Sequence, residues 1–427
     1  MMSVKFRTIK GVQDILPPRT YLWQRVEDAA KRIFSLYGFS EIRTPIIEFT
    51  ELFVRSIGED TDIVEKEMYT FQDRAGRSIT LRPEGTASVV RAYIQNNLYN
   101  LPAPQKFYYN GPMFRYERPQ KGRYRQFHQI GVEAFAVDAP YVEAELIEML
   151  WLLLEELGME NLNTEVNSIG CSECRPDYKK KLLNYLEGNL GSLCADCMRR
   201  YRHNPLRVFD CKVPSCKEII TGAPKITEFL CGNCGDHFKR FLSYLKKLDI
   251  PYSINPSMVR GLDYYTRTVF EVTTTSLGAQ NAVAAGGRYD TLVEEFGGPR
   301  TPAAGFAIGM ERLITLLEEK PFEPPRPDVY IVSLGDEATD VAYTVASSLR
   351  REGLQAELSY GTGSLKSQLR RADRFNATLA LIIGEDELRR GTLTCKRLSD
   401  GFQAEVKLTD LITDIKKYLN LSLNIEY

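Results

Sequence analysis

The sequence predicts an α+β protein with more than one domain, and three observations lead to this fold class. Residues 114–135 have the pattern of a β-hairpin, because two short strand-like runs flank turn-forming residues at 119–122. Apolar residues recur at helical spacing over 22–37 and again over 142–157. Near the C-terminal end, strand and helix patterns alternate, which is typical of a small α/β sheet domain.

Length and composition limit the possible classes of protein. The chain has 427 residues, of which 43% are apolar, so it can form two or three domains with sizeable cores. No apolar run reaches transmembrane length and the first residues lack a signal-peptide core, so we expect a cytoplasmic protein without a membrane partner. The net charge of −1 excludes a nucleic-acid binder that works by bulk charge. Any RNA partner must therefore meet local basic patches.

The predicted hairpin has an unusual charge content for paired strands. Arg115 and Glu117 share one face, and Gln129 and Glu133 share another if one residue is lost to a bulge. Buried ions are costly unless paired, so solvated edge residues are one interpretation. The loop favours nucleotide or nucleic-acid binding, because cations beside aromatic rings suit phosphates and stacked bases. Its cations are Arg118, Lys121, Arg123 and Arg125, and its aromatic residues are Tyr124 and Phe127.

Further elements follow from periodicity and from proline. The stripes over 22–37 and 142–157 predict helices that end at the glycines that follow them. Residues 39–52 alternate as a strand does, and Pro45 places such a strand at a sheet edge, for instance at a subunit contact. Residues 164–169 predict another strand.

The cysteines are concentrated in one segment. Eight of the nine lie between Cys171 and Cys234, as Cys171/Cys174, Cys194/Cys197, Cys211/Cys216 and Cys231/Cys234. Three of these pairs are C-x-x-C, and the gap from Cys174 to Cys194 is typical of four-thiolate zinc sites. A reducing cytoplasm disfavours disulfides. Structural zinc and small core residues without metal both stay open.

Several segments together resemble the histidyl-tRNA synthetases, a family of class II aminoacyl-tRNA synthetases. Residues 39–52 are similar to motif 1, the dimer-interface segment of the class, residues 114–135 to motif 2, and residues 305–313 to motif 3. Residues 260–271 and 285–290 resemble the two histidine-specific motifs of the family. The motifs occur in the expected order, and the resemblance covers nearly the full length.

The resemblance implies a domain organisation. A class II catalytic core with an antiparallel sheet is expected in residues 1–323, with a helical insertion at approximately 171–248 over the acceptor arm of the tRNA. The basic run 199–203 is a candidate for that contact or an ordinary solvated helix face. A stiff proline-rich linker at 321–327 precedes residues 328–427, which resemble the α/β anticodon-binding domain of this subgroup. The cationic helix of that domain carries Lys366, Arg370, Arg371 and Arg374, which serve either the anticodon or solubility.

The resemblance also implies an activity and its residues. The family ligates L-histidine to tRNA(His) with ATP and Mg²⁺, through a histidyl-adenylate, and releases AMP and pyrophosphate; its members are homodimers. The expected catalytic residues are Arg260 and Arg115, which would hold the α-phosphate. The expected histidine-binding residues are Glu84, Gly85, Thr86, Gln129, Glu133, Tyr264 and Tyr265. The expected ATP-binding residues are Arg115, Glu117, Arg123, Phe127 and Arg312. The candidate zinc ligands are the eight clustered cysteines.

Two other classes of function stay open from the sequence. One is a regulatory subunit of ATP phosphoribosyltransferase, which shares the catalytic fold without aminoacylation. Such a subunit usually lacks the C-terminal domain and an intact Arg260 motif, and both are present here. The other is a zinc-bearing RNA-binding module whose core only senses histidine or an analogue. Pyrophosphate exchange that depends on histidine separates the ligase from both.

Overall fold

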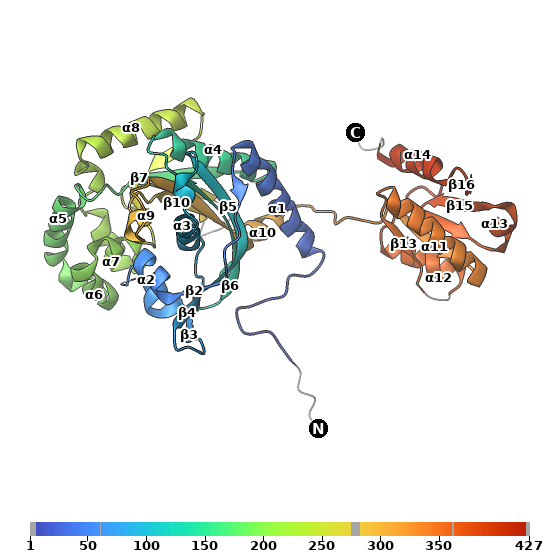
Figure 1. Ribbon diagram of the computed structural model, residues 1–427, viewed down its shortest axis with the longest axis horizontal. Helices are drawn as coiled ribbons and strands as arrows, with labels where there is room; N and C mark the ends of the chain where they lie inside the picture. Colours follow the sequence, from blue (N-terminus) through green and yellow to red (C-terminus); the bar gives the residue numbers. More distant parts are fainter. Residues whose placement is uncertain (1–5, 60, 121, 275–281, 361–362, 424–427) are drawn as a thin grey trace, which may run out of the picture. The chain divides into compact units, whose positions relative to one another are not determined.

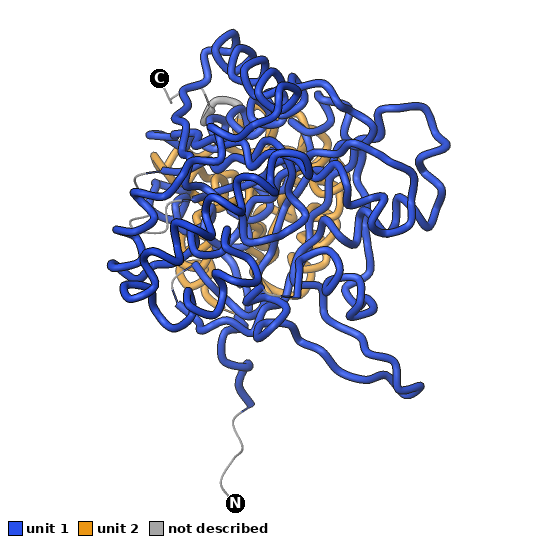
Figure 2. The backbone as a smooth tube through the Cα atoms, turned by 90° about the vertical axis from the view of Figure 1, so that its left-hand side faces the viewer, with its two compact units in different colours: residues 1–322 blue, residues 323–427 orange. Residues whose placement is uncertain are grey.

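The computed structural model divides the chain into two compact units, residues 1–322 and residues 323–427 (Figure 1, Figure 2). The division falls within the proline-rich segment 321–327. The structure describes residues 6–59, 61–120, 122–274, 282–360 and 363–423.

The first unit contains the large sheet, a small sheet and the insertion. Its elements before the insertion are α1 (Arg19–Leu36), β1 (Ser40–Glu41), β2 (Ile47–Phe49), α2 (Thr50–Ile57), the π-helical turn η1 (Ile63–Glu67), β3 (Tyr69–Gln72), β4 (Ser78–Leu81), α3 (Thr86–Gln95), η2 (Leu98–Asn100), β5 (Gln105–Phe114), β6 (Gln126–Phe135), α4 (Tyr141–Glu156) and β7 (Leu162–Ser168). The insertion contains α5 (Arg175–Glu187), η3 (Leu190–Ser192), α6 (Ala195–His203), η4 (Pro205–Asp210), α7 (Pro214–Thr221), η5 (Ile226–Glu228) and α8 (Gly232–Lys247). The unit ends with β8 (Tyr252–Ile254), β9 (Thr266–Thr274), β10 (Ala282–Arg288), α9 (Leu292–Glu295), β11 (Ala303–Gly309) and α10 (Met310–Leu317).

An eight-stranded sheet forms the centre of the first unit, in the order β1-β5-β6-β11-β10-β9-β7-β8. The pairs from β5 to β7 are antiparallel, and only the two short edge strands among the described residues, β1 and β8, pair in parallel. Strands far apart in the sequence therefore become neighbours: β6 of the hairpin lies between β5 and β11. The predicted α+β fold with an antiparallel core sheet is confirmed.

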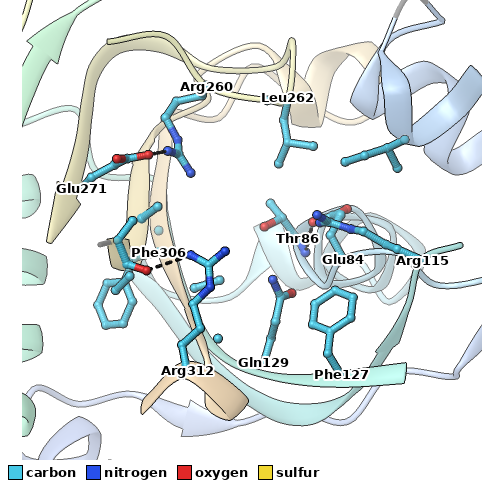
Figure 3. A pocket seen from close by; sticks show the side chains of 18 of the residues that line it. Glu84, Thr86, Arg115, Phe127, Gln129, Arg260, Leu262, Glu271, Phe306 and Arg312 are labelled. Atoms are coloured by element: carbon cyan, nitrogen blue, oxygen red, sulfur yellow. Dashed lines mark hydrogen bonds and ion pairs between the residues drawn. The ribbon is translucent and has the colours of Figure 1, made fainter. Parts of the chain in front are cut away.

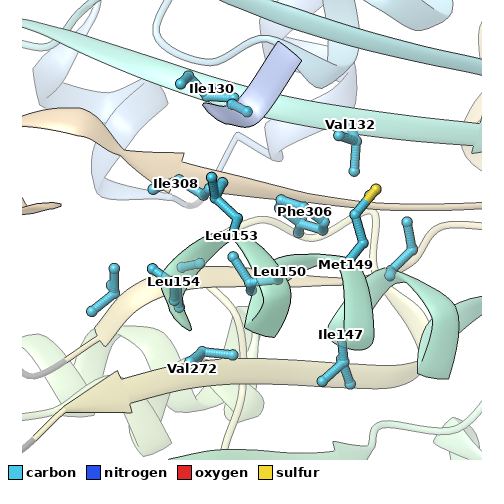
Figure 4. Packing of buried hydrophobic residues seen from close by; sticks show 14 of the residues in the cluster. Ile130, Val132, Ile147, Met149, Leu150, Leu153, Leu154, Val272, Phe306 and Ile308 are labelled. Atoms are coloured by element: carbon cyan, nitrogen blue, oxygen red, sulfur yellow. The ribbon is translucent and has the colours of Figure 1, made fainter. Parts of the chain in front are cut away.

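Alternation along β6 separates the hydrophobic core from the opposite face of the sheet. Ile130 and Val132 point toward the helix layer, where they pack with Met149 and Leu150 of α4 (Figure 4). Because side chains of a strand alternate, Gln129 and the other odd-numbered residues of β6 face the other side. Each fully buried Leu or Met of α4 contributes roughly 1.5–3 kcal/mol relative to exposure. This core holds β6 rigidly from behind.

Two sequence expectations for the first unit are corrected. The pairing of β5 with β6 runs without interruption from Gln105↔Phe135 to Phe114↔Gln126, so the bulge suggested between Gln129 and Glu133 is wrong. Residues four apart on a strand share a face without any bulge. The single strand expected over 39–52 is also wrong. It is two short strands in different sheets, β1 and β2, and its last residues begin α2. Lys121 of the loop lies outside the described residues.

The second unit is a five-stranded sheet with helices. Its elements are β12 (Val329–Ser333), α11 (Asp336–Arg351), β13 (Ala356–Leu358), α12 (Leu365–Arg374), β14 (Leu379–Ile383), α13 (Glu385–Arg390), β15 (Thr392–Arg397), β16 (Gln403–Lys407) and α14 (Leu411–Leu423). The strand order is β13-β12-β14-β15-β16, parallel through β14 and antiparallel beyond it. The β12 and β14 strands are apolar because a parallel sheet is covered on both faces. None of the helices in the described part of the chain has the length and apolar content of a membrane span.

Candidate active site

A cavity of about 290 Å³ opens on the face of the large sheet opposite α4 (Figure 3). Its size lies at the lower end of the range of about 300–1,000 Å³ that small-molecule sites occupy. Of the residues expected to act on histidine or ATP, all except Gly85 line this cavity. The lining residues among them are Glu84, Thr86, Arg115, Glu117, Arg123, Phe127, Gln129, Glu133, Arg260, Tyr264, Tyr265 and Arg312.

Glu133 forms the floor of the cavity. Its side chain is 1% exposed, and the Thr86 hydroxyl donates a hydrogen bond of 2.7 Å to its Oε1. The Tyr289 hydroxyl donates to Oε2. Burial raises the pKa of the Glu133 carboxyl to about 8, against the opposing effect of these hydrogen bonds. This carboxyl is therefore mainly protonated at neutral pH.

Glu84 also stabilises the start of α3. Its carboxylate accepts the backbone N–H groups of Thr86 at 2.6 Å and Ala87 at 2.9 Å, which lack partners within the helix. Burial is the main cause of the raised pKa of Glu84. The same carboxylate lines the cavity, so it is fixed in place before a ligand arrives.

Gly85 lies beneath the cavity wall, where it makes room for Tyr109. A Cβ atom at Gly85 would lie 2.3 Å from the Tyr109 ring, and a Cβ at Gly131 would meet the same ring at 2.3 Å. Tyr109 of β5 is 3% exposed and lines the cavity between these two glycines. Gly85 thus acts on the site through Tyr109.

Polar and aromatic side chains complete this end of the cavity. The Tyr264 and Tyr265 rings lie 4.7 Å apart. Burial raises the pKa of Tyr264 well above its ordinary value and that of Tyr265 to about 12, so both keep their hydroxyl protons at neutral pH. Gln129 on β6 carries a buried Oε1 that has no hydrogen-bond partner within the described residues. A buried acceptor without a donor is costly, which favours a donor supplied by a ligand.

A second group of lining residues, here called the rim, is cationic. The Arg115 guanidinium lies over the Phe127 ring, 5.3 Å from its centroid, and its Nε donates to the Pro83 carbonyl at 2.9 Å. Glu117 lies 3.1 Å from Arg123 Nη1, and the ion pair holds the loop after β5 against the cavity. An arginine beside an aromatic face suits a nucleotide, because the base stacks and the phosphate is neutralised.

Arg260 and Arg312 approach the same space from opposite walls (Figure 3). Among the described ion pairs, Arg260 pairs with Glu271 of β9, whereas its sequence neighbour Asp263 pairs with Arg207. The buried Nε of Arg260 has no hydrogen-bond partner in the described part of the chain. Arg312 in the first turn of α10 donates from Nη1 to the Ala282 carbonyl at 2.9 Å.

Among the lining residues that had no role assigned from the sequence are Tyr109, Glu271 and Tyr289. Tyr289 and Glu271 lie inside the two histidine-specific motifs, and this position in the motifs could have identified them as site residues. Tyr109 is one of several aromatic residues in β5, and its contact with two distant glycines leaves no trace in the sequence.

The eight clustered cysteines form two groups of four. The first cluster is Cys171, Cys174, Cys231 and Cys234, and the second cluster is Cys194, Cys197, Cys211 and Cys216. Within each, the Sγ atoms all lie within 4.8 Å of one another. The spacing from Cys174 to Cys194 suggested that neighbouring pairs combine, but the first pair combines with the last because the insertion folds back on itself.

The distances in both clusters fit a metal and do not fit a disulfide. The Sγ atoms of Cys171 and Cys174 are 3.7 Å apart, as are those of Cys194 and Cys211. Thiolates on a tetrahedral zinc at about 2.3 Å are about 3.8 Å apart, whereas a disulfide needs about 2.05 Å. The clusters could therefore hold metal ions.

Comparisons with known proteins agree with the motifs. The family model described as Histidyl-tRNA synthetase matches residues 11–173 and 220–313, and one described as Anticodon binding domain matches residues 328–418. The chain is 57% identical to the histidine–tRNA ligase of Thermodesulfovibrio yellowstonii, over 97% of this chain and 99% of that protein. It is 54% identical to that of Syntrophotalea carbinolica, over 94% and 96% of the two chains. The structure of apo S. aureus histidyl-tRNA synthetase has 36% identity and a TM-score of 0.82, over 96% of this chain and 100% of that one. This chain belongs to the histidyl-tRNA synthetase family.

Proposed function

We infer that this chain ligates L-histidine to tRNA(His) in two steps. The carboxylate of histidine attacks the α-phosphate of ATP, which enters as its Mg²⁺ complex, and pyrophosphate leaves. The terminal ribose hydroxyl of the tRNA then takes the histidyl group from the adenylate and releases AMP. The observation that carries the proposal is that buried carboxyl and tyrosine groups and several arginines line one cavity, together with the high identity to ligases.

The floor would bind the imidazole and the amino group. Glu133, Tyr264 and Tyr265 supply hydrogen-bonding groups for the two ring nitrogens, and their burial makes any unpaired group costly. Glu84, Thr86 and Gln129 would take the amino end, since a carboxylate and an unpaired amide oxygen suit an ammonium group. Gly85 contributes by leaving room for Tyr109.

The rim would bind ATP. Arg115 and Arg260 would meet the α-phosphate, where negative charge builds in the transition state. Phe127 and Arg312 offer faces for the adenine, while Glu117 and Arg123 orient the loop and the nucleotide. The protein then acts mainly by positioning the carboxylate and the phosphate and by stabilising charge.

The insertion would carry zinc in both clusters. The backbone N–H of Cys197 donates to the Cys194 sulfur at the start of α6 and lowers the pKa of that thiol to about 7, which favours the thiolate that a metal needs. Backbone N–H groups also donate to Cys174 and Cys216, at 3.1 and 3.2 Å, as in the outer shell of structural metal sites. Metal analysis of protein purified without chelator should find two zinc ions per chain. Clearly less than one would reject the proposal.

The assembly would be a cytoplasmic homodimer that binds tRNA with both units. Phe49, Ile79 and Phe71 are register partners across the sheet β2-β4-β3, and Phe49 and Phe71 are 55% and 46% exposed. Such an exposed apolar row supports a subunit contact, as expected for motif 1. In the second unit, the cationic residues of α12 and the family match support anticodon binding.

Pyrophosphate exchange tests the activity and the substrate. The exchange of labelled pyrophosphate into ATP should require L-histidine and proceed without tRNA; exchange driven by another amino acid, or none at all, would contradict the proposal. Glu133→Ala should raise the apparent KM for histidine far more than that for ATP, because a site built on polar contacts loses about 10⁴ in specificity when they are unmatched. Equal effects on both substrates would contradict the placement of Glu133.

A further inference from the structure

Two arginines of the insertion reach the backbone of the loop that carries Arg260. Arg207 of η4 donates from Nη1 to the Arg260 carbonyl at 2.9 Å, and Arg175 of α5 donates to the Tyr265 carbonyl. Arg207 is only 6% exposed, although it belongs to a segment that is otherwise peripheral to the sheet. Both ends of the loop from Arg260 to Tyr265, here called the catalytic loop, are therefore held from the insertion.

Asp263, in the middle of the catalytic loop, adds a third attachment. Its carboxylate pairs with Arg207 Nη2 and accepts a hydrogen bond of 3.2 Å from Asn204. Its backbone N–H donates to the Ile57 carbonyl at the end of α2, at 3.1 Å. Asp263 does not line the cavity, so its contacts serve the placement of the loop between α2 and the insertion.

The two arginines lie next to the two cysteine clusters. Arg175 directly follows Cys174 of the first cluster. Arg207 lies in the segment between Cys197 and Cys211, and both of these cysteines belong to the second cluster. The two ends of the segment that carries Arg207 are therefore held at the same cluster. A metal that joins the ends of such a segment restricts its backbone conformations and so limits the orientations of its side chains.

The same segment also contacts residues beside a second part of the cavity lining. Arg200 donates from Nη2 to both carboxylate oxygens of Asp62, each at 2.8 Å, and Arg199 lies 3.4 Å from Glu65. Asp62 precedes Ile63, which lines the cavity. These two members of the basic run therefore face the catalytic core in this structure.

We propose that the insertion is a brace on the catalytic loop, closed by Zn²⁺ at the two clusters, in which Arg207 and Arg175 are positioning residues. The proposal rests on the proposed function, because it gives the chemistry to Arg260. The brace fixes the backbone of Arg260, so that the guanidinium meets the α-phosphate where charge develops. A displacement of about 1 Å at a reacting centre can cost about 10²-fold in rate, so loss of one anchor is enough to slow the reaction.

The first test measures histidine-dependent pyrophosphate exchange, which involves no tRNA and so excludes effects on tRNA binding. In full-length, zinc-loaded enzyme, Arg207→Gln should lower kcat by about 10-fold to 10²-fold, with little change in the KM for ATP or in zinc content. Arg207→Lys, which keeps the charge beside Asp263, should recover part of kcat. The matched control is Arg202→Gln, because Arg202 is an exposed arginine of the same segment that bonds only to its neighbour Tyr201 in the described contacts. Normal kcat in Arg207→Gln would overturn the proposal.

A double-mutant cycle separates positioning from a general structural role. If Arg207 acts through Arg260, then Arg207→Gln should add almost no loss to that of Arg260→Ala, because the group it positions is already absent. If the losses in kcat of the two variants multiply in the double mutant, the proposed brace is wrong. Near-normal kcat in Arg260→Ala alone would instead overturn the proposed role of Arg260. The two failures are therefore distinguishable.

Hydrogen exchange tests the role of the metal without relying on activity. Removal of zinc with EDTA should speed amide exchange in residues 198–210 and in residues 260–265, while β6 stays protected; readdition of ZnCl₂ should restore protection. In zinc-loaded Arg207→Gln only the catalytic loop should exchange faster. An unchanged catalytic loop after measured loss of zinc would overturn the proposal, as would protein that takes up no zinc on titration.

Discussion

The protonation of Glu133 should give histidine binding a distinctive pH profile. Burial holds the pKa of this carboxyl at about 8, while the imidazole of free histidine titrates near 6.5. Between these values the free enzyme carries the proton and the free imidazole carries none. If the complex keeps one proton between the carboxyl and the imidazole, binding in this range neither takes up nor releases a proton, so the affinity should be flat.

The slopes outside the plateau follow from proton counting. Below about pH 6.5 the free carboxyl and the free imidazole hold two protons, so binding releases one and the affinity falls about tenfold per pH unit as pH falls. Above about pH 8 the free partners hold none, so binding must take up one and the affinity falls about tenfold per unit as pH rises. In Glu133→Gln the amide cannot titrate. The fall in affinity above about pH 8, which is caused by the carboxyl, should therefore vanish. The fall in affinity below about pH 6.5 should stay.

The assay is calorimetric titration of histidine into both proteins from pH 5.5 to 9.5. The α-amino group of free histidine also titrates at alkaline pH, but equally for both proteins, so the ratio of the two dissociation constants isolates residue 133. That ratio should be constant up to about pH 8 and change about tenfold by pH 9. A ratio that stays constant to pH 9.5 would refute the raised pKa of Glu133 or its contact with imidazole.

Three further changes test other parts of the site and its support. Arg260→Ala should lower the kcat of histidine-dependent exchange by about 10²–10³ while the KM for histidine changes little, because its charge contact strengthens in the transition state; activity lost only through unfolding would contradict this. Arg288→Met should lower the free energy of unfolding in urea by about 3–5 kcal/mol, because the fully buried Glu143 loses the guanidinium 3.1 Å away and keeps only its contact with His237 Nε2; a loss below about 1 kcal/mol would show that His237 alone satisfies Glu143. Gly85→Ala should displace the Tyr109 ring and raise the KM for histidine more than that for ATP, and unchanged kinetics would show that the ring can yield.

Long periodic elements were predictable from the sequence, and short ones were not. The helical stripes over 22–37 and 142–157 agree with α1 and α4 to within a few residues, because a stripe on one face requires a helix of that length. Residues 39–52 alternate as a strand does, yet Thr50 begins α2. Local alternation over a few residues does not reveal that β1 and β2 join different sheets, since that depends on partners elsewhere in the chain.

In the site, too, features that depend on local sequence were predictable and contacts between distant residues were not. The motif order indicated which residues to expect at a histidine and ATP site, and all of them but Gly85 line one cavity in the structure. The partners of these residues were not predictable. Arg260 pairs with Glu271 and not with its neighbour Asp263, because β9 carries Glu271 back along the sheet. The cysteines likewise combine first pair with last, which spacing alone does not indicate.

We expect the charge distribution in the cavity to orient a bound amino acid before any specific contact forms. Glu133 is 1% exposed and burial raises its pKa to about 8, so the floor carries less negative charge than its composition suggests. Arginine stays protonated in proteins, so the rim with Arg115 and Arg260 remains positive. We expect a zwitterion in this field to turn its carboxylate toward the rim and its ammonium toward the floor. The reacting carboxylate would then lie beside the arginines that we propose for the α-phosphate, and a fully ionised floor is not needed for this orientation.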